Sequence, residues 1–182
     1  MVTPFIFKIN MEQQVKELIK FLKQPEYSSK IRGAIAGSSM FEYFENQDVD
    51  LFLYDEIGFR YFVQHIYEKC GNNDMFTLKD DKEAFKIENL LFNNKDTHIK
   101  DNKVGLVTVK FLYNTCIELN LTFKFGTRTI FDVLKSFDTD IICKGYDIQS
   151  RQTLDLTYGS QDLRVASWNT WNPSYYNPKM WR

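Results

Sequence analysis

The fold is decided by residues 37–54, which read GSSMFEYFENQDVDLFLY and follow the apolar run IRGAIA at 31–36. A turn of small residues, a helix-sized stretch over 38–45 and a second apolar run follow one another, which predicts a strand, a turn, a short helix and a strand. On a strand, residues two apart point to the same side, with Cα atoms ~6.5 Å apart. Asp48 and Asp50 therefore share one face, and the apolar residues between and after them face a core.

The two aspartates form a candidate metal site. Carboxylate oxygens are the hard ligands that Mg²⁺ and Mn²⁺ prefer, and two such ions can stabilise the attacking and leaving oxygens of a phosphoryl displacement. Asp48 and Asp50 alone would leave a second ion under-neutralised, so a third acid is expected from a neighbouring strand. Glu118 is the best candidate, because it lies on the polar face of a strand predicted over 117–125. The alternative is a solvated strand end for the aspartates and a structural role for Glu118.

The Gly37-Ser38 turn is a candidate phosphate site. Backbone N–H groups at the N-terminus of the following helix favour an anion, and the Ser38 hydroxyl can donate a further hydrogen bond. Nine residues separate Ser38 from Asp48. A small-residue turn at this distance from paired carboxylates, in a strand-helix-strand context, favours a nucleotidyl-transferring site over a chance Asp-x-Asp pair.

Apolar periodicity extends this unit to a single α+β domain with one mixed sheet flanked by helices. Further helices are predicted over 11–22, from an Asn10 cap to a stop at Pro25, over 59–70, closed by Gly71, and over 129–136. Strands are predicted over 31–36, 49–54, 74–78, 107–113 and 117–125, with Asn114-Thr115 as a hairpin turn. The polar stretch 79–103 carries no clear pattern. We expect a domain over residues 1–165 and an aromatic tail over 166–182 that packs on the domain or on a partner.

Bulk properties narrow the class of protein. A chain of 182 residues suits one domain. A formal net charge of −1 excludes a protein that holds long nucleic acid by a global basic field alone, although a local basic patch is compatible with it. Three cysteines without CxxC spacing indicate reduced thiols, neither a disulfide framework nor a zinc site. We expect a cytoplasmic chain without a membrane segment.

Three segments of the C-terminal half resemble, in order, the catalytic head of tRNA CCA-adding enzymes. Residues 117–124, IELNLTFK, resemble the strand that carries the third carboxylate of that family. Residues 138–147, DTDIICKGYD, and 154–164, LDLTYGSQDLR, resemble two segments that follow it. With the Gly-Ser turn and the aspartates, the resemblance covers roughly residues 31–165. Residues 136–141, SFDTDI, which follow the strand over 117–124, also resemble predicted nucleotidyltransferases of large viruses and phages.

The resemblance implies a DNA polymerase β-like nucleotidyltransferase fold and the transfer of a nucleoside monophosphate from a triphosphate to a hydroxyl acceptor. It implies Mg²⁺ or Mn²⁺ as cofactor. Its implied metal ligands and catalytic residues are Asp48, Asp50 and Glu118. Its implied nucleotide-binding residues are Gly37, Ser38, Ser39, Lys135 and Asp138, the last as a supporting residue of the nucleotide site.

The chain also departs from that family. It carries neither the Arg nor the Asp that follow the glycine turn there, and Lys135 is the cation left where an Arg pair stands. The matched stretch ends before the family's neck, so we expect the acceptor (an RNA 3′ end, a protein or a small molecule) to be bound by the chain's own loops, a second copy or a partner subunit. Two rivals remain: a catalytically silent nucleotide-binding or protein-interaction module, and hydrolysis by the same metal cluster.

Other candidates are weaker. His65 lies beside apolar positions of a predicted helix and is interpreted as a packing histidine, and His98 as a loop residue. Asp138 and Asp140 form a rival metal pair that fits a cap or a supporting position better. Aromatic residues of the tail could stack on bases, with nearby cations on phosphates, but packing across the sheet or a second protomer is favoured. These aromatic residues are Tyr158, Trp168, Trp171, Tyr175, Tyr176 and Trp181.

Overall fold

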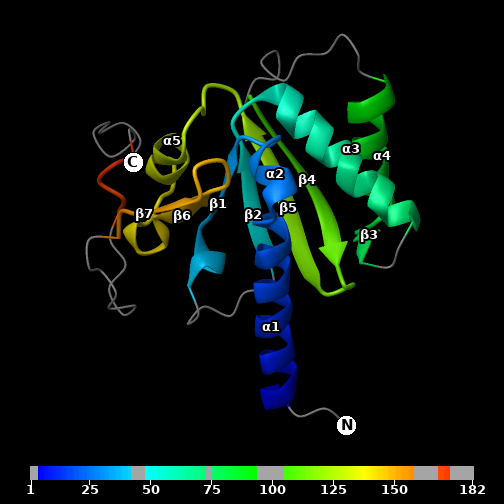
Figure 1. The fold of residues 1–182 in the computed structure, drawn as a ribbon, viewed down its shortest axis with the longest axis horizontal. Coiled ribbons are helices and arrows are strands. Elements are labelled where there is room, and N and C mark those ends of the chain that lie inside the picture. Colours follow the sequence, from blue (N-terminus) through cyan, green and yellow to red (C-terminus); the bar gives the residue numbers. More distant parts are fainter. Residues whose placement is uncertain (1–3, 42–47, 73–74, 94–104, 158–167, 173–182) are drawn as a thin grey trace, which may run out of the picture.

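A computed structural model describes residues 4–41, 48–72, 75–93, 105–157 and 168–172 of the chain (Figure 1). The helices are α1 (Pro4–Leu22), α2 (Pro25–Ser28), α3 (Glu56–Asn72), α4 (Asp81–Glu88) and α5 (Ile130–Lys135), with short turns η1 (Ser38–Met40), η2 (Asn89–Asn93) and η4 (Asp140–Ile142). The strands are β1 (Gly33–Ala36), β2 (Asp48–Leu53), β3 (Phe76–Leu78), β4 (Leu106–Tyr113), β5 (Ile117–Lys124), β6 (Lys144–Asp147) and β7 (Gln152–Asp155).

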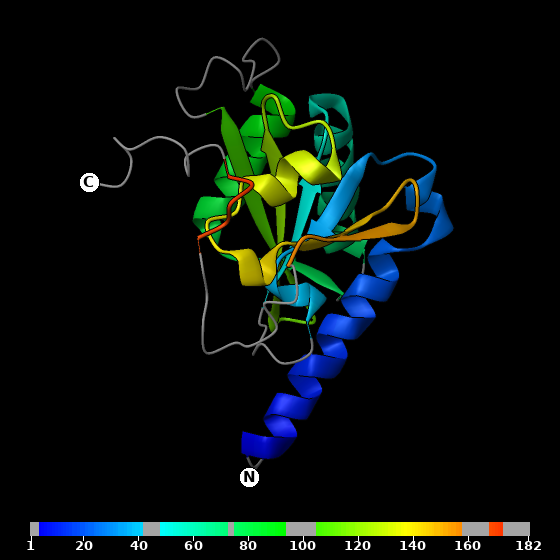
Figure 2. The same cartoon turned by 90° about the vertical axis from the view of Figure 1, so that its left-hand side faces the viewer.

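The described strands form one seven-stranded mixed sheet in the order β3-β4-β5-β2-β1-β6-β7. The β2–β5 pair is parallel, and every other pair is antiparallel. Helix α3 lies on one side of the sheet and α5 on the other, as two perpendicular views show (Figures 1 and 2). The expected α+β class with a mixed sheet flanked by helices is confirmed. In the described part of the chain no helix is long and apolar enough to cross a membrane.

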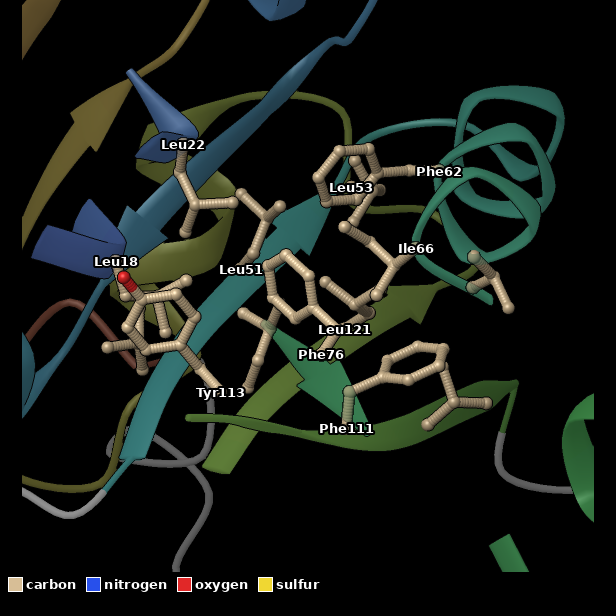
Figure 3. Packing of buried hydrophobic residues seen from close by; sticks show 14 of the residues in the cluster. Leu18, Leu22, Leu51, Leu53, Phe62, Ile66, Phe76, Phe111, Tyr113 and Leu121 are labelled. Carbon is tan, nitrogen blue, oxygen red and sulfur yellow. The ribbon is translucent and has the colours of Figure 1, made fainter. Parts of the chain in front are cut away.

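The main core lies between the sheet and helices α1 and α3. Residues along β2 alternate strictly between half-buried and buried positions, and Leu51 is fully inaccessible. Its neighbours on this face contact Leu18 of α1 and Ile66 of α3 (Figure 3). Burying each such side chain contributes about 1.5–3 kcal/mol. The alternation leaves Asp48 and Asp50 on the opposite face, which is the α5 side of the sheet.

Two helix boundaries differ from the prediction. Helix α1 begins at Pro4, so Asn10 lies inside the helix and is not its N-cap. Proline at the first helical position suits a helix start because its fixed φ is already helical and its missing N–H is not needed there. Helix α3 continues through Gly71 to Asn72, and the φ of Gly71 is not positive, so the predicted glycine C-cap is wrong.

The β4–β5 hairpin is confirmed, the strands predicted over 31–36 and 74–78 are present in shortened form, and the strand predicted over 49–54 is shifted by one residue. Asn114 and Thr115 have φ of 49° and 62°, and Cys116 N donates to Tyr113 O at 3.1 Å, which makes a type I′ turn. The predicted helix over 38–45 is a single turn, Ser38–Met40, and 42–47 lie outside the described residues. The helix expected over 129–136 is α5, capped by the Thr129 side chain.

The polar stretch 79–103, for which the sequence showed no clear pattern, contains α4, and this helix packs against the sheet. Asp80 Oδ1 accepts a hydrogen bond from Glu83 N at 2.8 Å and caps the helix. Glu83 is buried, and its Oε2 accepts from Lys110 N at 3.2 Å, at the point where β3 no longer pairs with β4. The Asp-x-x-Glu spacing at 80–83 is the sequence signal of such a helix start. Helix α4 therefore holds the backbone of Lys110 in place.

Part of the expected tail contacts the domain. Asn169 is fully buried, and its Nδ2 donates to Leu134 O at 3.0 Å and to Phe137 O at 2.9 Å. The ring of Trp171 meets that of Phe131 at a centroid distance of 5.4 Å. Residues 158–167 and 173–182 lie outside the described residues. The division of the chain at 165 therefore stays a prediction.

Gly33 gives a test of the β1–β2 pairing. A Cβ at this position would lie 2.6 Å from the Phe52 carbonyl oxygen, which is backbone and cannot move aside cheaply. We expect Gly33→Ala to lower the free energy of unfolding by about 1–3 kcal/mol, measured by urea denaturation. Gly71→Ala is the matched control, since nothing lies within 4 Å of its Cβ position in α3.

The control should stabilise the protein by about 0.5–1 kcal/mol, because alanine loses less backbone entropy than glycine in a helix. Equal effects of the two substitutions would contradict the described β1–β2 contact.

Candidate functional site

The parallel pairing of β2 and β5 brings the predicted acids together. Asp48 lies directly opposite Glu118, and Asp50 lies directly opposite Asn120. Paired strands run about 4.8 Å apart, and residues two apart share a face. The four polar side chains therefore occupy the corners of one small patch on the α5 side of the sheet.

Asn120 orients Asp50. Its Nδ2 donates a hydrogen bond to Asp50 Oδ1 at 2.8 Å. Burial raises the pKa of Asp50, and this hydrogen bond opposes the shift only in part. The Oδ1 atom of Asn120 is itself buried and has no hydrogen-bond partner among the described residues. The pair thus presents a poorly solvated carboxylate and an unused amide oxygen.

Two lysines hold Glu118. Its Oε1 lies 3.0 Å from Lys79 Nζ and 3.3 Å from Lys110 Nζ. Burial alone would raise the pKa of Glu118, but the hydrogen bonds to these lysines outweigh burial and lower it. Burial raises the pKa of the neighbouring Asp48, and the charge of Glu118 adds to this effect. An ionised glutamate therefore stands beside two aspartates that resist ionisation.

The glycine turn lies against this patch. Gly37 has φ of 96° and ψ of −152°, a conformation that disfavours any residue with a Cβ. A Cβ there would stand 3.9 Å from Asp50 Oδ2. Ser39, in the turn η1, is 8% exposed, and its Oγ has no hydrogen-bond partner among the described residues. The Gly37 turn therefore lies next to Asp50.

A hollow of about 560 Å³ opens over the same face of the sheet. Its polar wall includes Asp50, Asn120 and Lys110, and its apolar wall includes Phe52 and Phe137. The two phenylalanine rings are 5.7 Å apart between centroids. This volume lies within the range of small-ligand sites, which combine apolar walls with a few directed polar groups.

The acids fit a divalent cation in part. No group of three or more His, Cys, Asp or Glu side chains is placed to hold a metal ion among the described residues. Asp48 and Asp50 are suited to an ion, because a cation would relieve the cost of their burial and proximity. Glu118 is paired with Lys79 and Lys110 instead. The donor set therefore fits an ion on the two aspartates, and Glu118 would join only if its lysines moved.

Two predicted nucleotide-binding residues make their described contacts with groups other than the acids. Lys135 Nζ pairs with Asp132 Oδ1 at 3.2 Å and lies 5.7 Å from the centre of the Phe131 ring, which keeps it on α5. Asp138 is exposed, and its backbone oxygen accepts a hydrogen bond from Asn169 N at 2.9 Å. No described contact joins either residue to the aspartates, so their roles stay predictions.

His65 has a structural setting. Its Nε2 lies 3.1 Å from Tyr27 Oη, and its ring stacks with those of Tyr61 and Phe62. Burial lowers the pKa of His65, so the neutral ring is favoured. These contacts agree with the interpretation as a packing histidine. His98 lies outside the described residues.

Three residues of the site were missed by the sequence analysis: Lys79, Lys110 and Asn120. Asn120 follows Glu118 by two residues on the same strand face, so the period of two could have identified it. Lys110 is opposite Asn120 on β4, a register that becomes available only once the hairpin turn is fixed. Lys79 follows the short strand β3, and its approach to Glu118 has no signal in the sequence.

We compared the chain with models of protein families, with curated proteins and with solved structures, and none of them matches it.

The opposed pKa shifts of Asp50 and Glu118 give a stability test in EDTA. The raised pKa of Asp50 means that its contribution to stability is present at low pH and is lost as pH rises through the folded-state pKa. Asp50→Asn should therefore raise the free energy of unfolding at pH 7, while its amide oxygen still accepts from Asn120. The gain should vanish below about pH 3.9, where the unfolded carboxyl is also protonated.

Glu118→Gln is the control of opposite sign. Because the pKa of Glu118 is lowered in the folded protein, its ionised carboxylate stabilises the fold at pH values above its pKa in the unfolded chain. This substitution should therefore lower the free energy of unfolding at pH 7. Urea denaturation at several pH values measures both changes. Shifts of the same sign would contradict the described charge arrangement.

Proposed function

We propose that the chain is a metal-dependent nucleotidyltransferase with a polymerase β-like fold, which moves a nucleoside monophosphate from a triphosphate to a hydroxyl acceptor and releases pyrophosphate. The observation that carries the proposal is the register of β2 and β5. This register places Asp48 beside Glu118 and Asp50 beside Asn120. The Gly37 turn lies next to Asp50. Acids on neighbouring strands beside a glycine turn are what the sequence resemblance implies for this reaction.

The proposal gives each group a role. Asp48 and Asp50 would hold Mg²⁺ or Mn²⁺, which when bound neutralises phosphate charge and polarises the acceptor hydroxyl. The turn from Gly37 to Ser39 binds the triphosphate, and the Ser39 hydroxyl, which has no hydrogen-bond partner within the described part of the chain, is a donor. Asn120 fixes the orientation of Asp50.

The chemical step needs positioning more than covalent catalysis. The acceptor oxygen forms a bond to the α-phosphorus, and the bond from that phosphorus to the pyrophosphate oxygen breaks. The hydroxyl proton passes to one of the three carboxylates. Lys110, which lines the hollow beside Asp50, adds positive charge near the reacting phosphates.

Label transfer tests the reaction. We expect the protein to transfer label from an α-labelled nucleoside triphosphate to an RNA or protein acceptor with Mg²⁺, and Asp48→Asn/Asp50→Asn to reduce the rate by at least about 100-fold. The loss follows because several kcal/mol of charge stabilisation disappear with the ion. Glu12→Gln, which removes an exposed carboxylate on α1, should transfer at the wild-type rate.

Equal transfer by wild type and the double variant would end the proposal. Release of free labelled monophosphate without acceptor labelling would show hydrolysis by the same groups instead.

A second candidate is a catalytically silent nucleotide-binding module of the same fold. The ion pairs of Glu118 with Lys79 and Lys110 favour it, because they place positive charge where a second metal ion would stand. In that case the protein binds a triphosphate in the hollow but transfers nothing.

The lysine pair separates the two candidates. Lys79→Met/Lys110→Met should raise Mg²⁺ affinity by at least about tenfold in calorimetry, since removing two nearby like charges favours the ion. Lys82→Met, an exposed change on α4, should leave the affinity unchanged. If the protein binds a triphosphate, labels no acceptor and has the same Mg²⁺ affinity with and without the double substitution, it is the silent module.

A further inference from the structure

A second hollow adjoins the first at the end of β2. It measures about 380 Å³, and its lining includes Tyr54 and Arg128. The preceding residues, Leu53 and Thr127, line the 560 Å³ hollow instead. Consecutive Cα atoms are 3.8 Å apart, so two separate segments each pass from one hollow directly into the other. The two hollows therefore adjoin at these two segments, and the first extends to Asp50.

Exposed cations border these two hollows beyond the acids. Lys124 lines the first hollow, and Arg32 and Arg128 line the second. All three side chains are exposed, and none of them makes an ion pair within the part of the chain that the structure describes. We call these three residues the basic track. It stands out on a chain whose formal net charge is −1.

The acid that faces the second hollow is already satisfied. Asp147 Oδ1 accepts a hydrogen bond from Tyr54 Oη at 2.7 Å, and its Oδ2 accepts from Ser150 N at 2.8 Å. Burial raises the pKa of Tyr54, so its hydroxyl stays a donor. The guanidinium groups of Arg32 and Arg128 are left to bind an external anion, and arginine presents its donors in a fork that matches phosphate oxygens.

The dimensions suit a strand of nucleotides. From Asp50 to Tyr54 the chain advances about 13 Å along the strand direction, and Asn120 to Lys124 spans the same length. At roughly 3.4 Å per stacked nucleotide, this distance holds about four phosphates. The apolar wall of the first hollow, which includes Phe52 and Phe137, offers faces on which bases can stack.

We propose that the acceptor is a single-stranded polynucleotide, whose 3′ end lies at Asp48 and Asp50 and whose upstream phosphates lie on the basic track. Its role as acceptor rests on the proposed nucleotidyl transfer, but its binding to the track does not. The track explains how a chain without a global basic field would hold such a substrate.

Fluorescence anisotropy tests the track. The probe is an unstructured single-stranded RNA of about 12 nucleotides with a 5′ fluorescein, titrated with the protein in EDTA at several salt concentrations. Arg32→Gln/Arg128→Gln should weaken binding by about tenfold or more, and should reduce the slope of log K against log[salt] by about 1.4. The control, Lys20→Gln/Lys82→Gln, removes the same charge from exposed positions on α1 and α4 and should leave both quantities unchanged.

Two results would overturn the proposal. One is binding by the arginine double variant that equals the wild type in affinity and salt slope. The other is displacement of the RNA by polyglutamate of equal charge as readily as by unlabelled RNA, which would make the surface a site for acidic protein segments.

The test is separable from that of the reaction. Asp48→Asn/Asp50→Asn should still bind the RNA in EDTA, because the track lies beyond the acids. If the protein binds RNA but transfers no label, the proposed reaction is wrong and the basic track stands. If the arginine double variant labels RNA as well as the wild type does, the basic track is wrong and the proposed reaction stands.

Discussion

The parallel pairing of β2 with β5 is the interaction on which the rest of the structure depends. It fixes at once which faces of both strands enter the core and which polar side chains meet on the other side. A slip of one residue in this register would place Asp50 in the apolar layer beneath α1 and α3. Burial of Leu51 and its neighbours therefore holds the acids in place, and the stability of the core and the geometry of the site have one cause.

The sequence predicted the elements that depend on local periodicity and turn chemistry. The alternation along 117–125 and the Asn114-Thr115 turn gave the hairpin, and Asp48-Val49-Asp50 gave the face on which the acids lie. Errors arose where the chain tolerates more than one conformation, as at Gly71, which stays helical. The place of Lys110 beside Glu118 follows from the hairpin register. The contact of Lys79 with Glu118 could not be predicted, because Lys79 follows the short strand β3, whose place in the sheet has no local signature.

The electrostatics of the patch bear on both candidate functions. Two aspartates whose pKa values are raised by burial lie beside a glutamate whose pKa is lowered by lysines. Burying the charges of the two aspartates costs free energy, and a bound cation would reduce that cost. Buried acids with raised pKa values are typical of functional sites. The lysines can neutralise the acids in the absence of an ion, and the same charges are well placed to meet phosphates. The hollow and the basic track beyond them extend this charge pattern along the sheet.

Paramagnetic broadening by Mn²⁺ tests the central claim most directly, because it locates the ion without requiring turnover. At substoichiometric Mn²⁺, the backbone amide signals of Gly37, Val49 and Leu119 should lose intensity first, while those of Ile57 and Gln152 persist. The pattern should disappear in Asp48→Asn/Asp50→Asn. Uniform broadening, or broadening centred on another part of the sheet, would contradict the account.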